Sequence, residues 1–129
     1  MIQSKHMQKK ILIIEDDSFL QGLISRKLKT DGFDVSIALK AADAFDLLGK
    51  GLAPDLFILD LLLPEIDGFE VLKRIRENPT YKSIPVIIFS NLSEEKDIKR
   101  VKDLGVSEFM IKANFTLDEL SAKVKSTIK

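Results

Sequence analysis

Cysteine is absent from this chain of 129 residues, and histidine occurs only once, as His6. Without cysteine there can be no disulfide bond, no thiolate nucleophile and no cysteine-ligated zinc, which agrees with a reducing cytoplasm. A serine hydrolase is also excluded, because the chain has neither the nucleophile-elbow motif nor a histidine beyond His6. We therefore expect no thiol redox chemistry and no histidine-based catalysis.

An excess of charge of either sign is absent as well. Twenty Lys and Arg residues balance twenty Asp and Glu residues, so the formal net charge is zero. Such a chain has no overall field to attract DNA, RNA or an anionic membrane. No apolar run approaches the ~20 residues that cross a bilayer, and the N-terminus lacks the apolar segment of a signal peptide. We expect a cytoplasmic protein with no direct nucleic-acid or membrane partner.

The length fits one domain, because single domains cluster near ~100–150 residues. Apolar residues make up 45% of the chain and charged residues 31%, as in ordinary globular proteins. The first residues are polar and show no hydrophobic period. We expect residues 1–8 to be a disordered tail or a tag remnant, and residues 9–129 to be the folded domain.

Short apolar runs alternate with amphipathic segments along the remaining chain. Strands are predicted at residues 11–14, 34–38, 56–59, 85–89 and 109–111, and helices are predicted to begin near Asp17, Ala41, Asp67, Ser93 and Thr116. The buried stripe of the first helix is expected to contain Phe19, Leu20, Leu23, Ile24 and Leu28. Strands that alternate with helices pair in parallel, and the helices cover both faces of the sheet. The pattern predicts a doubly wound α/β sandwich of three layers with a parallel five-stranded sheet.

Polar residues follow the predicted strands at their carboxyl ends, where sheets of this class bind ligands. The first strand is followed by Glu15, Asp16 and Asp17, and the third strand by Asp60. Ser90 and Asn91 follow the fourth strand, and Lys112 follows the fifth. Asp17 is interpreted as a helix-starting residue, since a helix N-terminus favours negative charge. Asp60 needs another explanation, because it stands inside a nearly continuous apolar run.

If the carboxylates of Glu15, Asp16 and Asp60 converge, their repulsion must raise a pKa or recruit a cation. Oxygen ligands without cysteine or histidine favour a hard cation, and carboxylates with waters and a carbonyl suit Mg²⁺. Lys112 would add one movable positive charge. Such a site is suited to receive a phosphoryl group, with Asp60 as the nucleophile that forms an acyl phosphate.

Four segments together resemble one family, the receiver domain of two-component response regulators. They are Ile11 to Asp17 (ILIIEDD), Asp55 to Gly68 (DLFILDLLLPEIDG), Ile84 to Ser90 (IPVIIFS), and Lys112. The segments occur in the family's order and at its spacing, and the likeness covers about residues 9–128. The resemblance implies the flavodoxin-like (βα)5 fold with strand order 2-1-3-4-5.

The resemblance also implies a role for each matching residue. Asp60 resembles the phosphoacceptor and Lys112 the lysine that contacts the phosphoryl group. Asp16, Asp60 and the main-chain carbonyl of Leu62 would bind Mg²⁺ directly, and Glu15 would act through water. Ser90 takes the position of the switch hydroxyl, and Phe109 that of the switch aromatic residue.

One departure concerns the residue after Lys112. The family usually has a proline there in a cis peptide, whereas this chain has Ala113. A cis bond before a non-proline residue costs about 2.5–4 kcal/mol. Two outcomes are open: a strained cis peptide, or a trans peptide with Lys112 aimed differently. Asn91 is a second departure, because the family commonly has a smaller residue at this position, and it is expected to narrow access for the donor.

The implied partners are a histidine kinase or histidine phosphotransfer protein, and a downstream effector or output domain. A phosphorylation-dependent dimer is also possible in this family, and the chain fits either a stand-alone receiver or part of a longer regulator. It is expected to be a phosphoacceptor rather than an enzyme, with at most self-phosphorylation and self-dephosphorylation activity. A dehalogenase-type phosphatase needs a second Asp two positions after the nucleophile, where this chain has Leu62. The alternative is a pseudo-receiver that binds proteins without phosphorylation.

Overall fold

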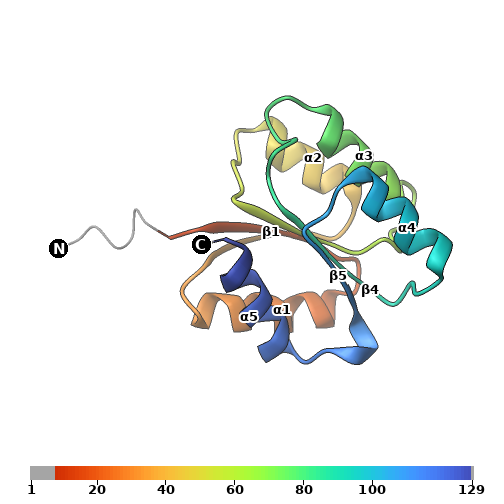
Figure 1. Cartoon of the computed structure of the whole chain (residues 1–129). Coiled ribbons are helices and arrows are strands. Elements are labelled where there is room, and N and C mark those ends of the chain that lie inside the picture. Colours follow the sequence, from red (N-terminus) through yellow and green to blue (C-terminus); the bar gives the residue numbers. More distant parts are fainter. Residues whose placement is uncertain (1–7, 129) are drawn as a thin grey trace.

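The computed structural model describes residues 8–128, in which five strands alternate with five α-helices (Figure 1). The elements are β1 (Lys10–Ile14), α1 (Ser18–Thr30), β2 (Asp34–Ala38), α2 (Ala41–Gly49), β3 (Leu56–Leu59), α3 (Gly68–Glu77), β4 (Val86–Ser90), α4 (Glu95–Leu104), β5 (Glu108–Ile111) and α5 (Leu117–Thr127). A short 3₁₀ turn, Lys112–Asn114, lies between β5 and α5. The predicted alternation of strands and helices is confirmed.

The sheet is parallel throughout, in the order β2-β1-β3-β4-β5, so the predicted doubly wound topology is also confirmed. Helices α1 and α5 cover one face, and α2, α3 and α4 cover the other (Figure 1). Strand β3 (LFIL) is buried at every position, because helices exclude water from both faces of a central strand. This packing fixes the carboxyl ends of β1, β3, β4 and β5 along one edge of the sheet.

Three of the predicted helix starts are closed by side-chain caps. Asp17 accepts hydrogen bonds from the N–H groups of Phe19 and Leu20, Asp67 accepts one from Glu70, and Thr116 forms a reciprocal capping box with Glu119. The fourth helix was expected to begin near Ser93, but Ser93 is not its cap. Helix α4 begins at Glu95, and its N-cap residue Glu94 makes no side-chain cap bond. Negative charge at Glu95 and Asp97 in the first turn favours that helix start electrostatically.

The prediction that Phe19 is buried is also wrong, since 76% of the residue is exposed. The buried positions of α1 are Gln21, Ile24, Ser25 and Leu28. Phe19 precedes Leu28 by nine residues, which is about two and a half helical turns, so the two side chains point to opposite sides. Phe19 consequently projects outward in the first turn of α1, directly after the strand end that contains Glu15 and Asp16.

The carboxylate of Asp31 ties the end of α1 to α5. It accepts a hydrogen bond from the buried Ser121 hydroxyl and lies 3.4 Å from the Lys27 ammonium and 3.8 Å from that of Lys125. The Ser121 hydrogen bond, followed by the two lysines, lowers the pKa of Asp31 below its ordinary value of 3.8. The ionised form is therefore the one that stabilises the packing of α1 on α5.

We expect Asp31→Asn to make the free energy of unfolding less dependent on pH in the acidic range. A carboxylate with a lowered pKa contributes stability above its unfolded pKa, and this contribution is lost as the pH falls through the folded value. The variant should be less stable than the parent at neutral pH and should lose less stability between about pH 5 and pH 2. Urea unfolding across this range measures both effects. Asp34→Asn, at the amino end of β2, is the control, and an unchanged pH profile for Asp31→Asn would contradict the assignment.

Residues 1–7 and 129 lie outside the described part of the chain, and so does nearly all of the expected tail, including His6. Gln8 is described, and its side-chain amide donates a hydrogen bond to the carbonyl of Gly32 at 3.2 Å. Within residues 8–128, no helix combines the length and apolarity that a bilayer span requires.

Candidate functional site

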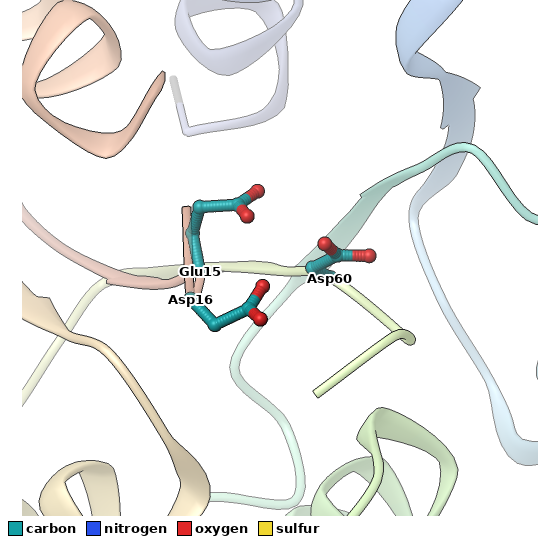
Figure 2. Close-up of side chains that lie close together, drawn as sticks. All are labelled: Glu15, Asp16 and Asp60. Carbon is teal, nitrogen blue, oxygen red and sulfur yellow. The ribbon is translucent and has the colours of Figure 1, made fainter. Parts of the chain in front are cut away.

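Three carboxylates gather where β1 and β3 end side by side. Glu15 and Asp16 follow β1, and Asp60 follows β3, with its N–H donating to the carbonyl of Ile14 at 3.0 Å. Each of the three residues offers a carboxylate oxygen, and these oxygens lie within 4.8 Å of one another. Figure 2 shows the carboxylates of Glu15 and Asp16 directed toward the side on which Asp60 lies. The structure therefore brings together the three acidic residues that the sequence placed at the ends of two strands.

Lys112 reaches this acidic group from the end of β5. Its ammonium nitrogen lies 2.7 Å from Glu15 Oε1 and 2.8 Å from Asp60 Oδ2. Only 15% of the lysine side chain is exposed, and the two carboxylate side chains are almost fully buried. One cation thus bridges two carboxylates that come from different strands, and Asp16 remains the exposed member of the group.

Backbone N–H groups also donate hydrogen bonds to the two buried carboxylates, Glu15 and Asp60. The N–H of Asp17 donates to Glu15 Oε2 at 3.1 Å, and the N–H of Leu62 donates to Asp60 Oδ1 at 3.1 Å. Each carboxylate thus uses one oxygen for a backbone donor and the other for Lys112. The contact that the structure shows between Leu62 and Asp60 is made by the Leu62 N–H. A role for its carbonyl as a ligand stays a prediction.

Burial and neighbouring charge act in opposite directions on this cluster. Burial raises the pKa of Glu15, and the nearby Asp60 adds to the rise, although Lys112 and the Asp17 N–H oppose it. Burial also acts to lower the pKa of Lys112, but its hydrogen bonds to Asp60 and Glu15 outweigh this, so the pKa is raised. Three carboxylates and one ammonium leave the site with a negative charge. Its all-oxygen donors favour a hard divalent cation, and such a cation would relieve the repulsion.

Ser90 and Phe109 lie near the site without entering the acidic cluster. Ser90 is the last residue of β4 and is fully buried, and its hydroxyl oxygen accepts a hydrogen bond from the Leu92 N–H at 3.3 Å. Among the described residues, Ser90 makes no hydrogen bond to Asp60. Phe109 is half-buried on β5 and packs against the core under α2, α3 and α4. The switch roles predicted for these two residues stay predictions.

The Lys112–Ala113 peptide is trans, since the described residues contain no cis peptide bond. A trans peptide was expected to aim Lys112 elsewhere, and this part of the expectation is wrong, because the ammonium contacts Asp60 and Glu15. The reason is the 3₁₀ turn that begins at Lys112. Ala113 has an N–H that a proline would lack, and this group donates to Asn91 Oδ1 at 3.1 Å.

Gly68 is a residue whose importance the sequence interpretation missed. Its N–H donates to the carbonyl of Leu61 at 3.0 Å, so the first turn of α3 packs directly on the backbone that follows Asp60. A Cβ atom at this position would lie 2.5 Å from Leu61 Cα and would overlap the Asp60 carbonyl oxygen. The sequence signal was the Asp67-Gly68 pair, which had been interpreted only as a helix start. Glycine is required here for close approach to the site.

Comparison with known proteins adds family information to this geometry. The chain is 33% identical over 123 residues to the phosphate regulon transcriptional regulatory protein PhoB of Rhizobium meliloti, covering 95% of this chain and 53% of PhoB. The chain spans about half the length of the curated relatives it matches.

Two solved structures are similar over most of both chains. The phosphorylated cyanobacterial phytochrome response regulator RcpA superposes with a TM-score of 0.80 at 34% identity, covering 93% of this chain and 91% of RcpA. The Mn²⁺-bound form of response regulator Rcp1 superposes with a TM-score of 0.79 at 31% identity, covering 92% of this chain and 90% of Rcp1. A sequence model described as the response regulator receiver domain matches residues 11–125. The chain therefore belongs to the receiver-domain family of two-component response regulators.

Proposed function

We propose that Asp60 accepts a phosphoryl group from a phosphohistidine of a partner kinase or phosphotransfer protein. The observation that carries the proposal is the Lys112 ammonium, which bridges Asp60 and Glu15 at 2.8 and 2.7 Å beside Asp16. An Asp60 oxygen forms the new P–O bond while the P–N bond to the donor histidine breaks. The imidazole nitrogen keeps the bonding electrons and takes up a proton. Lys112 then offsets charge on the transferred phosphoryl oxygens.

Mg²⁺ is the cofactor that we assign to the acidic group. Asp16, Asp60 and the Leu62 carbonyl would hold it directly, and Glu15 would hold it through water. A bound Mg²⁺ supplies positive charge that neutralises the phosphoryl oxygens and lowers the repulsion among the carboxylates. The donor set supports this assignment, because the three side chains offer only oxygen within a 4.8 Å spread. The similar Rcp1 structure is described as Mn²⁺-bound.

The phosphorylated site would act on Ser90 and Phe109. The hydroxyl of Ser90 would leave the Leu92 N–H and donate to the phosphoryl group, and Phe109 would turn into the space released. A hydrogen bond to a charged group contributes about 1.5–3 kcal/mol, whereas shifting a population from 1:99 to 99:1 needs about 5.5 kcal/mol. The remaining free energy must come from a partner or a dimer contact on the α4, β5 and α5 face.

Exposed apolar side chains around the site support docking of a donor protein. Phe19, Leu62 and Phe115 are exposed by 76%, 51% and 39%, and they follow β1, β3 and β5 at the same edge of the sheet. Apolar residues next to a charged cluster indicate a protein surface as the partner.

We propose a cytoplasmic domain of residues 9–129 behind a tail at 1–8, without direct nucleic-acid or membrane binding. Its effector would be an output domain or a separate protein.

Incubation with Mg²⁺ and acetyl phosphate tests the proposed function. The protein should gain the mass of one phosphoryl group, and peptide mapping should place it on Asp60. Chelation of Mg²⁺ should prevent the gain. No mass gain, together with no binding of beryllofluoride, would overturn the proposal and leave a protein-binding pseudo-receiver. A phosphoryl group mapped to another residue would overturn it as well.

We expect the phosphoryl group on Asp60 to be hydrolysed slowly in the parent protein and faster in the Leu62→Asn variant. Leu62 is half-exposed two residues after Asp60, and Leu92 lies close to Ser90, so neither apolar side chain can orient an attacking water. A polar side chain at position 62 could donate to or accept from that water, for about a tenfold gain in rate. Phosphate release after removal of the donor measures the rate. The exposed Leu39, changed to Asn, is the control. A parent lifetime of seconds would contradict the prediction.

A further inference from the structure

One hydrogen bond joins the loop that follows Ser90 to the turn that begins at Lys112. The N–H of Ala113 donates to Asn91 Oδ1 at 3.1 Å, and the partners are 22 residues apart in the chain. Asn91 directly follows Ser90, the last residue of β4, and Ala113 directly follows Lys112. The strands themselves pair up to Ser90 and Ile111, so this bond extends the link between β4 and β5 beyond the sheet.

The bond exists because residue 113 is not proline. A proline would remove the donor, and it would also disfavour the helical backbone of the residue before it. Lys112 begins the 3₁₀ turn Lys112–Asn114, a conformation that a following proline resists. The chain thus holds its lysine with a trans peptide and a side-chain acceptor from the loop that follows β4.

Among the described residues, few other hydrogen bonds hold the backbone of this turn. Within the described residues, the Phe115 N–H reaches the Lys112 carbonyl at 3.4 Å, which is long for a hydrogen bond, and the next fixed point is the capping box at Thr116. The turn must nevertheless hold the Lys112 ammonium within 2.8 Å of both Asp60 and Glu15. A long lysine side chain reaches a defined point only if its backbone is held.

We propose that Asn91 is a positioning residue for Lys112, and that its amide oxygen holds the 112–114 turn in the orientation that phosphoryl acceptance needs. Asn91 acts through Ala113 and does not touch the carboxylates. The inference rests on the proposed function, since its consequence is expressed in phosphorylation of Asp60.

The test compares Asn91→Leu, which keeps the size and shape but removes the acceptor, with Asn91→Asp, which keeps an acceptor oxygen. Amide hydrogen exchange at Ala113 should be slow in the parent and in Asn91→Asp, and faster in Asn91→Leu. The rate of phosphorylation by acetyl phosphate, measured in Mg²⁺ at high salt to screen the added charge, should fall about threefold to tenfold in Asn91→Leu. In Asn91→Asp, which keeps the acceptor, the rate of phosphorylation should stay close to that of the parent.

Two controls separate the positioning of Lys112 from altered access of the phosphodonor to Asp60 and from a general loss of structure. Asn114→Leu makes the same change one residue beyond Ala113 in the same turn and should keep the parental rate. In a Lys112→Met background, adding Asn91→Leu should change neither the residual rate nor the affinity for beryllofluoride, because the lysine through which Asn91 acts is gone. A further loss in that background, or a parental rate in Asn91→Leu, would overturn the inference.

Failure of the inference can be distinguished from failure of the proposed function. If the parent gains no phosphoryl group, the proposed function fails, and exchange at Ala113 still reports whether Asn91 holds the turn. If the parent is phosphorylated and Asn91→Leu exchanges Ala113 as slowly as the parent does, only the positioning role fails.

Discussion

Asp60→Asn should abolish phosphoryl acceptance and, in the presence of a chelator, make the protein more stable than its parent. The carboxylate oxygen that would form the P–O bond is replaced by an amide, which is a poor nucleophile. Asn still offers an oxygen to the Leu62 N–H, so the local hydrogen bond at Asp60 Oδ1 can be kept. No phosphoryl group should be detected by mass spectrometry after incubation with acetyl phosphate and Mg²⁺.

The gain in stability follows from the charges around Asp60. Asp60 shares a 4.8 Å spread with Glu15 and Asp16, and the variant keeps the 2.7 Å pair between Lys112 and Glu15. Repulsion from two carboxylates is removed at the cost of one attraction to Lys112, and we expect a net gain of about 1 kcal/mol in the free energy of unfolding. With Mg²⁺ present, the parent should become more stable than the variant, because the ion stabilises the parent by mass action and binds the variant less well.

Urea unfolding with chelator and with Mg²⁺ measures this reversal. Asp34→Asn removes an exposed carboxylate at the amino end of β2 and should show neither the gain nor the altered response to Mg²⁺. A variant at position 60 that is less stable than the parent in chelator would contradict the placement of the charges. A variant that still acquires phosphate would contradict the choice of Asp60.

Gly68→Ala should destabilise the protein by about 3 kcal/mol, although alanine is the better helix former. The added Cβ would lie 2.5 Å from Leu61 Cα and against the Asp60 carbonyl, so the backbone itself must move. Neither contact is the end of a flexible side chain that could turn away. The displacement falls on the segment that contains Asp60, so phosphorylation should slow as well. Urea unfolding and the acetyl phosphate assay measure the two effects.

Gly22→Ala is the matched control for Gly68→Ala. Gly22 is exposed within α1, and a Cβ there would meet nothing within 4 Å. This substitution should stabilise the protein by about 0.5–1 kcal/mol through helix propensity alone. If both substitutions had similar effects, the close approach at Gly68 would not be the cause.

The order of the elements could be predicted from the sequence because it depends on local patterns. β3 (LFIL) is buried on both faces and matches its predicted bounds, and the helix predicted to begin near Thr116 is capped by that residue. Two predictions failed for different reasons. Phe19 is apolar and follows a helix start, but the helical period already places it on the side opposite Leu28, away from the core. Ser93 is a good cap by residue type, yet α4 begins two residues later.

The sequence by itself determined which chemical groups stand at the ends of the strands: Glu15 and Asp16, Asp60, Ser90, and Lys112. Strand and helix periods are local, and they repeat within a few residues, so they can be recognised without knowing any contact. Only the tertiary structure decided which of these groups meet. Lys112 reaches Asp60 and Glu15 through a trans peptide held by Asn91, Ser90 stays outside the cluster, and Gly68 lets α3 pack beside Asp60. The contacts of Lys112 and Asn91 join segments tens of residues apart, and all of these contacts depend on sheet register and helix packing, which no local pattern encodes.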